Sequence, residues 1–83
     1  MTSYEVKLVK QIIEYYEIAQ NGQSIYSIRD FKERSIEYCR AYLAALVDTG
    51  IIDARCKINT LRNLKKLIYD LYLEMEVEEY EVR

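Results

Sequence analysis

The chain has 83 residues, 51% of them hydrophobic and 31% charged, which fits one globular domain and excludes a disordered or fibrous chain. It has no histidine, two glycines and two cysteines, so the common zinc sites, the Ser-His-Asp triad and a glycine-rich phosphate loop are excluded; we expect no enzyme, no metal and no cofactor. The net charge of −2 hides a basic middle, because residues 23–66 carry nine lysines and arginines against five acids, whereas residues 67–83 carry one against six.

The first predicted element is a helix over residues 3–20. Its apolar residues, among them Leu8 and Ile12, recur at the three-to-four spacing of one helix face. Asn21 and Gly22 follow, and both residue types tolerate the left-handed conformation that ends many helices. We therefore expect this pair to stop the first helix.

Two helices separated by a turn are predicted next. Ser27 has an aspartate three positions on, as in a capping box, and precedes a short helix over residues 28–34. Ser35 is the expected N-cap of a third helix over residues 36–48. Gly50 would end that helix in the left-handed conformation.

A strand-like segment and a long helix complete the chain. Residues 51–58 contain branched side chains in partial alternation and no helical stripe, which predicts one or two short strands. In the helix that follows, over residues 60–80, the apolar residues step by three and four positions. Such a helix is about 30 Å long, more than a compact domain of this size needs, so its stripe is predicted to pair two subunits in a homodimer. The alternative is that the stripe covers the chain's own core. The predicted dimerisation residues are Leu61, Leu64, Ile68, Leu71 and Met75.

Several residues in the middle of the chain have the spacing of a known DNA-binding motif. Ile25 and Ile28 form an apolar pair, Ser35 follows seven residues after Ile28, and Leu43 and Leu46 lie beyond it. In this spacing the chain resembles the winged helix-turn-helix regulators, in which a serine at that position caps the recognition helix. The tyrosine- and isoleucine-rich composition is similar to small regulators of this kind from thermophilic archaea and their viruses.

The resemblance implies a mainly α fold with a short β-wing. A single domain over residues 1–83 would contain the helix-turn-helix at about 25–50, the wing at about 51–58 and the dimerisation helix at about 60–80. The implied function is regulation of transcription by a homodimer that binds double-stranded DNA sequence-specifically and contacts the transcription machinery. The helix at 36–48 would lie in the major groove. Two other functions stay open: a winged helix that mediates protein assembly, and a nonspecific DNA-coating protein.

The outward face of the helix at 36–48 supplies the expected base contacts. Its alanines permit close approach, and its polar side chains are placed to reach base edges or phosphates. Basic residues of the neighbouring segments would contact phosphates, which supply affinity rather than sequence choice. The alternative for this alanine-rich face is packing against another subunit or protein. The predicted DNA-binding residues are Arg29, Lys32, Arg34, Ser35, Glu37, Tyr38, Arg40, Ala41, Tyr42, Arg55 and Lys57.

The remaining sequence features concern the compartment and the cysteines. No apolar run approaches the roughly 18 residues of a membrane span, and the first residues do not form a signal peptide. We expect a cytoplasmic protein, in the host cytoplasm if its origin is viral, with no membrane partner. Cys39 falls on the core face of the third helix and is expected to be buried, whereas Cys56 lies in the expected wing, open to solvent.

Overall fold

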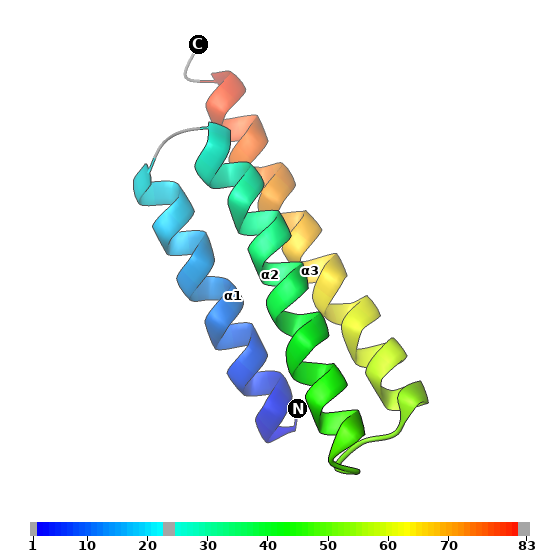
Figure 1. Ribbon diagram of the computed structural model, residues 1–83. Coiled ribbons are helices and arrows are strands. Elements are labelled where there is room, and N and C mark those ends of the chain that lie inside the picture. Colours follow the sequence, from blue (N-terminus) through cyan, green and yellow to red (C-terminus); the bar gives the residue numbers. More distant parts are fainter. Residues whose placement is uncertain (1, 23–24, 82–83) are drawn as a thin grey trace.

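The protein is a bundle of three helices, α1 (Ser3–Gly22), α2 (Ile25–Asp48) and α3 (Ala54–Glu81). The computed structural model describes the backbone of residues 2–22 and 25–81 and the side chains of residues 2–22 and 27–75. The helices run up, down and up, so that α1 and α3 are parallel and α2 is antiparallel to both (Figure 1). The bundle is elongated, with Cα extents of 48 × 18 × 17 Å.

This architecture shows that the predicted winged helix-turn-helix fold is wrong. No strand occurs in the described part of the chain, and α2 continues through Ser35, where the turn was expected. The reason is that the segment around Ser35 contains neither glycine nor proline, so nothing interrupts the helix. The buried face of α2 also runs straight through that position. It consists of the apolar residues Ile28, Phe31, Cys39 and Leu43, with Ser35 in the middle.

The expected wing is also absent, because most of residues 51–58 belong to α3. The backbone N–H of Cys56 donates to the Asp53 carboxylate at 2.7 Å, so Asp53 caps α3 and the helix begins at Ala54. The long helix predicted over residues 60–80 is thus confirmed, but it starts six residues earlier. The connection from α2 is therefore reduced to a few residues after Asp48.

The two glycines have different roles. Gly50 has a φ of 78°, and the N–H of Ile51 bonds back to the Leu46 carbonyl at 2.9 Å, which confirms the predicted left-handed end of α2. Gly22 is itself the last residue of α1 and has no such φ, so the predicted left-handed conformation there is wrong. A Cβ at Gly22 would lie 2.6 Å from Ser27 Oγ, so a larger residue here would require the Ser27 side chain to move.

All three helices contribute to one core. The helix predicted over residues 3–20 is confirmed as α1, and Leu8, Ile12 and Ala19 of its predicted stripe are buried. Cys39 is fully buried as expected, and burial raises the pKa of its thiol to about 11, so it stays protonated at neutral pH. The buried apolar residues are Leu8, Ile12, Ala19, Ile28, Phe31, Cys39, Leu43, Leu64, Ile68 and Met75.

Aromatic and sulfur contacts join the helices around this core. Tyr16 meets Phe31 edge-on, with ring centroids 5.9 Å apart, which fixes α1 against α2. Cys56 is half-buried rather than open, and its Sγ lies 3.2 Å from Tyr4 Oη, which connects the first turns of α1 and α3. This hydrogen bond is the main reason that the pKa of Tyr4 is raised above its ordinary value.

Ser35 is a buried residue whose replacement by alanine is expected to stabilise the protein. Its side chain is fully buried, and Oγ has no hydrogen-bond partner among the described residues. We expect Ser35→Ala to raise the free energy of unfolding by about 1–2 kcal/mol, because it removes an unpaired buried hydroxyl and introduces a better helix former. Urea denaturation measures the gain.

The control for this prediction is Ala41→Ser, because Ala41 is exposed on the same helix. That variant reports the helix-propensity difference between alanine and serine without any burial. The gain from Ser35→Ala should exceed the loss from Ala41→Ser. Equal magnitudes would mean that the buried hydroxyl costs nothing.

Candidate nucleic-acid interface

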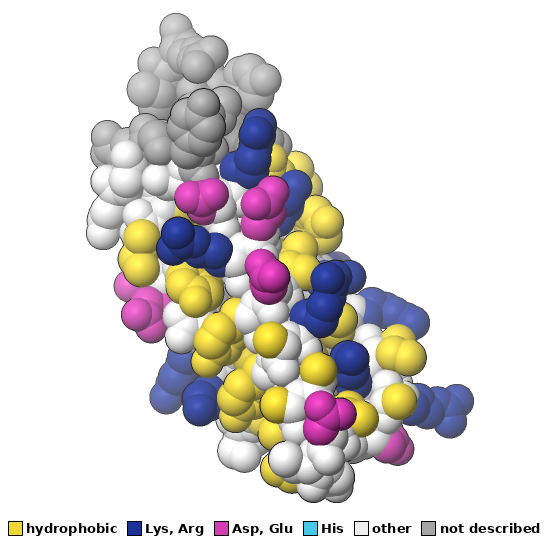
Figure 2. Space-filling model, viewed as in Figure 1, with side chains coloured by type: hydrophobic (Ala, Val, Ile, Leu, Met, Phe, Trp, Pro, Cys, Tyr) yellow, Lys and Arg dark blue, Asp and Glu magenta, His cyan; other side chains and the backbone are white. Residues whose placement is uncertain are grey.

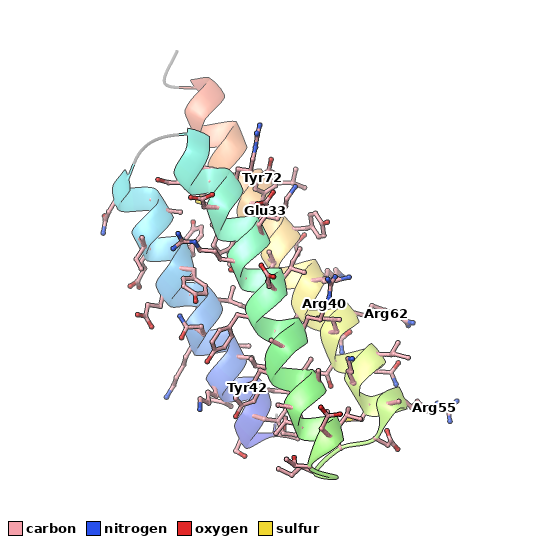
Figure 3. All side chains as sticks on the ribbon, viewed as in Figure 1. Glu33, Arg40, Tyr42, Arg55, Arg62 and Tyr72 are labelled. Carbon is pink, nitrogen blue, oxygen red and sulfur yellow. The ribbon has the colours of Figure 1, made fainter. Side chains whose placement is uncertain are left out.

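The aromatic residues predicted to contact DNA from the 36–48 helix face the neighbouring helix instead. Tyr38 packs edge-on against Tyr15 of α1 at 6.2 Å and stacks on Tyr42 at the same centroid distance. The Lys7 ammonium lies 5.1 Å from the centre of the Tyr42 ring, and Figure 3 shows Tyr42 between α1 and α2. These two tyrosines therefore hold α1 and α2 together.

The outward face of α2 is acidic. Helical spacing places Glu37 at the middle of this face, with two acids one and two turns before it and one acid about three turns after it. Figure 2 shows acidic side chains along the visible face of α2. Because like charges repel within a Debye length of about 10 Å, this face disfavours DNA phosphates. The exposed acids of α2 are Asp30, Glu33, Glu37 and Asp48.

The basic residues of α2 lie in different surroundings. The Lys32 ammonium is 4.7 Å from the Tyr72 ring centre and 5.9 Å from that of Tyr69, which holds it against α3. Arg40 extends toward the edge of the bundle that α3 forms (Figure 3).

The eleven predicted DNA-binding residues differ in exposure: six are exposed, four are half-buried and Ser35 is buried. The exposed ones are Arg29, Arg34, Glu37, Arg40, Ala41 and Arg55. The half-buried ones are Lys32, Tyr38, Tyr42 and Lys57.

The strongest basic surface is the outward side of the first part of α3, which we name the α3 face. Residues 54–69 carry five lysines and arginines and no acid over about 24 Å of helix. Figure 2 shows basic side chains gathered along this edge, and Figure 3 shows Arg55 and Arg62 pointing away from the bundle. The exposed residues that define the α3 face are Arg55, Ile58, Asn59, Arg62 and Lys66.

The charge of the α3 face is not compensated by neighbouring carboxylates. Among the residues whose side chains are described, no lysine or arginine forms an ion pair within 4 Å. The nearest acids along the chain are Asp53, which caps the helix, and Asp70, beyond the far end of the face. The partial positive charge of the helix N-terminus adds to the same end of the surface. The cations of the α3 face therefore lie open to solvent without a carboxylate partner among the described residues.

The side chains of the α3 face also suit contacts with bases. Arginine and asparagine can each make two hydrogen bonds to a purine, and lysine binds phosphate as a point charge. Ile58 is 58% exposed, and an apolar group here fits a base methyl better than it fits a phosphate. One surface thus carries cations together with side chains of the types that bind base edges in protein–DNA complexes.

Sequence reasoning identified only part of this surface. Arg55 was predicted to contact DNA, but as part of a wing, while Asn59, Arg62 and Lys66 were not selected at all. The signal that would have found them is the absence of acids from residues 54–69. That signal was hidden because the segment was divided between a predicted strand and a predicted helix.

The five residues predicted to form a dimer interface lie in the core of the single chain. Leu64, Ile68 and Met75 are buried, and Leu61 and Leu71 are half-buried against the same core. This placement agrees with the alternative that the α3 stripe covers the chain's own core. The homodimer itself stays a prediction.

Of the surfaces described above, the α3 face is the strongest candidate for a binding site. No helix of the described segments is long and apolar enough to cross a membrane. No protein-family model, curated protein or solved structure matches this chain.

Proposed function

We propose that this protein binds double-stranded DNA, with the α3 face in the major groove. The observation that carries the proposal is the run of exposed, unpaired basic side chains on α3, interleaved with Asn59 and Ile58. An α-helix with its side chains is about 10–12 Å across, which matches a major groove about 12 Å wide. The cations would neutralise phosphates, and the uncharged side chains would meet base edges.

The proposal keeps the predicted partner and changes the helix that contacts it. In the fold predicted from the sequence, the helix over residues 36–48 entered the groove. In the bundle, that segment presents acids outward and packs its tyrosines against α1. DNA bound at the α3 face would lie beside Arg40 and away from Glu37. A protein that binds in this way and discriminates between sequences would regulate transcription.

Titration of duplex DNA with two charge-matched double variants tests the proposal. Arg55→Gln/Lys66→Gln removes two exposed cations from the α3 face, and Lys10→Gln/Arg34→Gln removes two exposed cations from α1 and α2. Fluorescence anisotropy with a labelled 20-bp duplex should show about tenfold or greater weakening for the first variant only. The slope of log K against log salt between 50 and 200 mM should also fall by about 2, or roughly one per lost phosphate contact.

Two results would contradict the proposal. The proposal requires the wild-type protein to bind duplex DNA at low salt, so the absence of binding at 50 mM salt would exclude the function. Equal weakening by both double variants would mean that only net charge matters, and that the α3 face is not the binding surface. Circular dichroism melts of all proteins confirm that exposed substitutions leave the bundle intact.

A further inference from the structure

We infer that Asn59 and Arg62 read two neighbouring base pairs, whereas Arg55 and Lys66 hold the phosphates on either side. The inference rests on the proposed function and assigns a role to each part of the α3 face. All four side chains are exposed on α3. Along the helix, Asn59 and Arg62 form the inner pair, and Arg55 and Lys66 lie four residues outside them on either side.

The shape of the major groove separates the inner pair from the outer pair. A straight helix touches the floor of a curved groove over only a short length, so its ends rise toward the sugar–phosphate backbone. The rise from Arg55 to Lys66 is about 16 Å, or about five base-pair steps of 3.4 Å, so these two cations lie toward the ends of the contact. The outer cations therefore reach phosphates, and the central side chains reach base edges.

The chemistry of the inner pair specifies what it reads. Asparagine bonds to N6 and N7 of adenine, and arginine bonds to O6 and N7 of guanine. Asn59 and Arg62 are separated by about 4.5 Å along the helix, close to the 3.4 Å step between base pairs. The expected target therefore contains an adenine and a guanine on adjacent base pairs.

Two neighbouring residues support the assignment and provide its controls. Ile58 is exposed beside Asn59, and its apolar side chain suits the C5 methyl of a thymine. Asn63 has the same chemistry as Asn59 but lies two helical turns after Cys56, whose Sγ contacts Tyr4 of α1. Asn63 is thus turned toward the α1 side of α3 and away from the centre of the face.

Selection from randomised 20-bp duplexes, followed by titration, tests the inference. The wild-type protein should enrich a consensus in which replacing either of two adjacent base pairs weakens binding about tenfold. Asn59→Ala should abolish discrimination at the A·T pair only, and Arg62→Ala at the neighbouring G·C pair only. A duplex with 7-deazaguanine at that pair, which lacks N7, should reproduce the loss of preference on wild-type protein.

Two control variants separate base reading from general affinity. Asn63→Ala should leave the consensus unchanged. Lys66→Ala should weaken all duplexes equally, because a phosphate contact carries no sequence information. The inference is overturned if wild-type protein binds duplexes in a salt-dependent way without any consensus, or if Asn63→Ala relaxes specificity while Asn59→Ala does not. Failure to bind any duplex would instead overturn the proposed function.

Discussion

Replacing Phe31 with alanine is expected to lower the free energy of unfolding by about 3–5 kcal/mol. Phe31 is only 2% exposed and is the largest fully buried side chain. Its ring also meets Tyr16 of α1 edge-on, so truncation removes an aromatic contact and leaves a cavity between helices. Because a small domain has few other buried groups to compensate, the loss amounts to a large part of the total stability.

Urea denaturation followed by circular dichroism measures this loss. Leu73→Ala is the matched control, since Leu73 is a large apolar residue that is 53% exposed on α3. It should change the free energy of unfolding by less than about 1 kcal/mol. A Phe31→Ala variant as stable as Leu73→Ala would show that Phe31 does not lie in a packed core.

The first and last helices could be predicted because their signals are local and repeated. Leu8 and Ile12 follow the helical period over the whole of α1, and Leu64 and Ile68 do so in α3. Each helix therefore has several residues that independently indicate the same face. The positive φ at Gly50 was predictable for a similar reason, because glycine is the residue that adopts it without strain.

The continuity of α2 could not be predicted from its serines. Ser27 and Ser35 have the residue type of an N-cap, but a serine on the inward face of a helix has the same sequence signature as a cap. Tertiary packing decides between the two, and here Ser35 is buried on the same stripe as Phe31 and Cys39. The spacing of that stripe was a better guide than the capping pattern.

The α3 face was divided by the same kind of ambiguity. Ile51, Ile52 and Ile58 suggested strands, because branched residues favour the β conformation. Asp53 overrides that preference by capping a helix that starts at Ala54. Propensity is a weak guide when a cap and a long helix follow directly. Residues 54–69 form one helix, and only as one helix do they present the α3 face as a single surface.

A proline at residue 37 distinguishes a continuous α2 from two helices joined by a turn. In α2, residue 37 lies in the middle of the helix, where proline removes one backbone hydrogen bond and its ring clashes with the carbonyl four residues earlier. In the helix-turn-helix alternative, residue 37 lies in the first turn after Ser35, where no intrahelical bond is lost. We expect Glu37→Pro to lower the free energy of unfolding by about 3 kcal/mol or more.

The control is Glu37→Ala, which removes the same exposed side chain and keeps the backbone N–H. It should alter the free energy of unfolding by less than about 0.5 kcal/mol, because Glu37 makes no described contact that alanine would lose. The two variants are compared by urea denaturation under identical conditions. A Glu37→Pro protein within 1 kcal/mol of Glu37→Ala would contradict the continuous helix and restore a turn at Ser35, because only a first-turn position accepts proline at so small a cost.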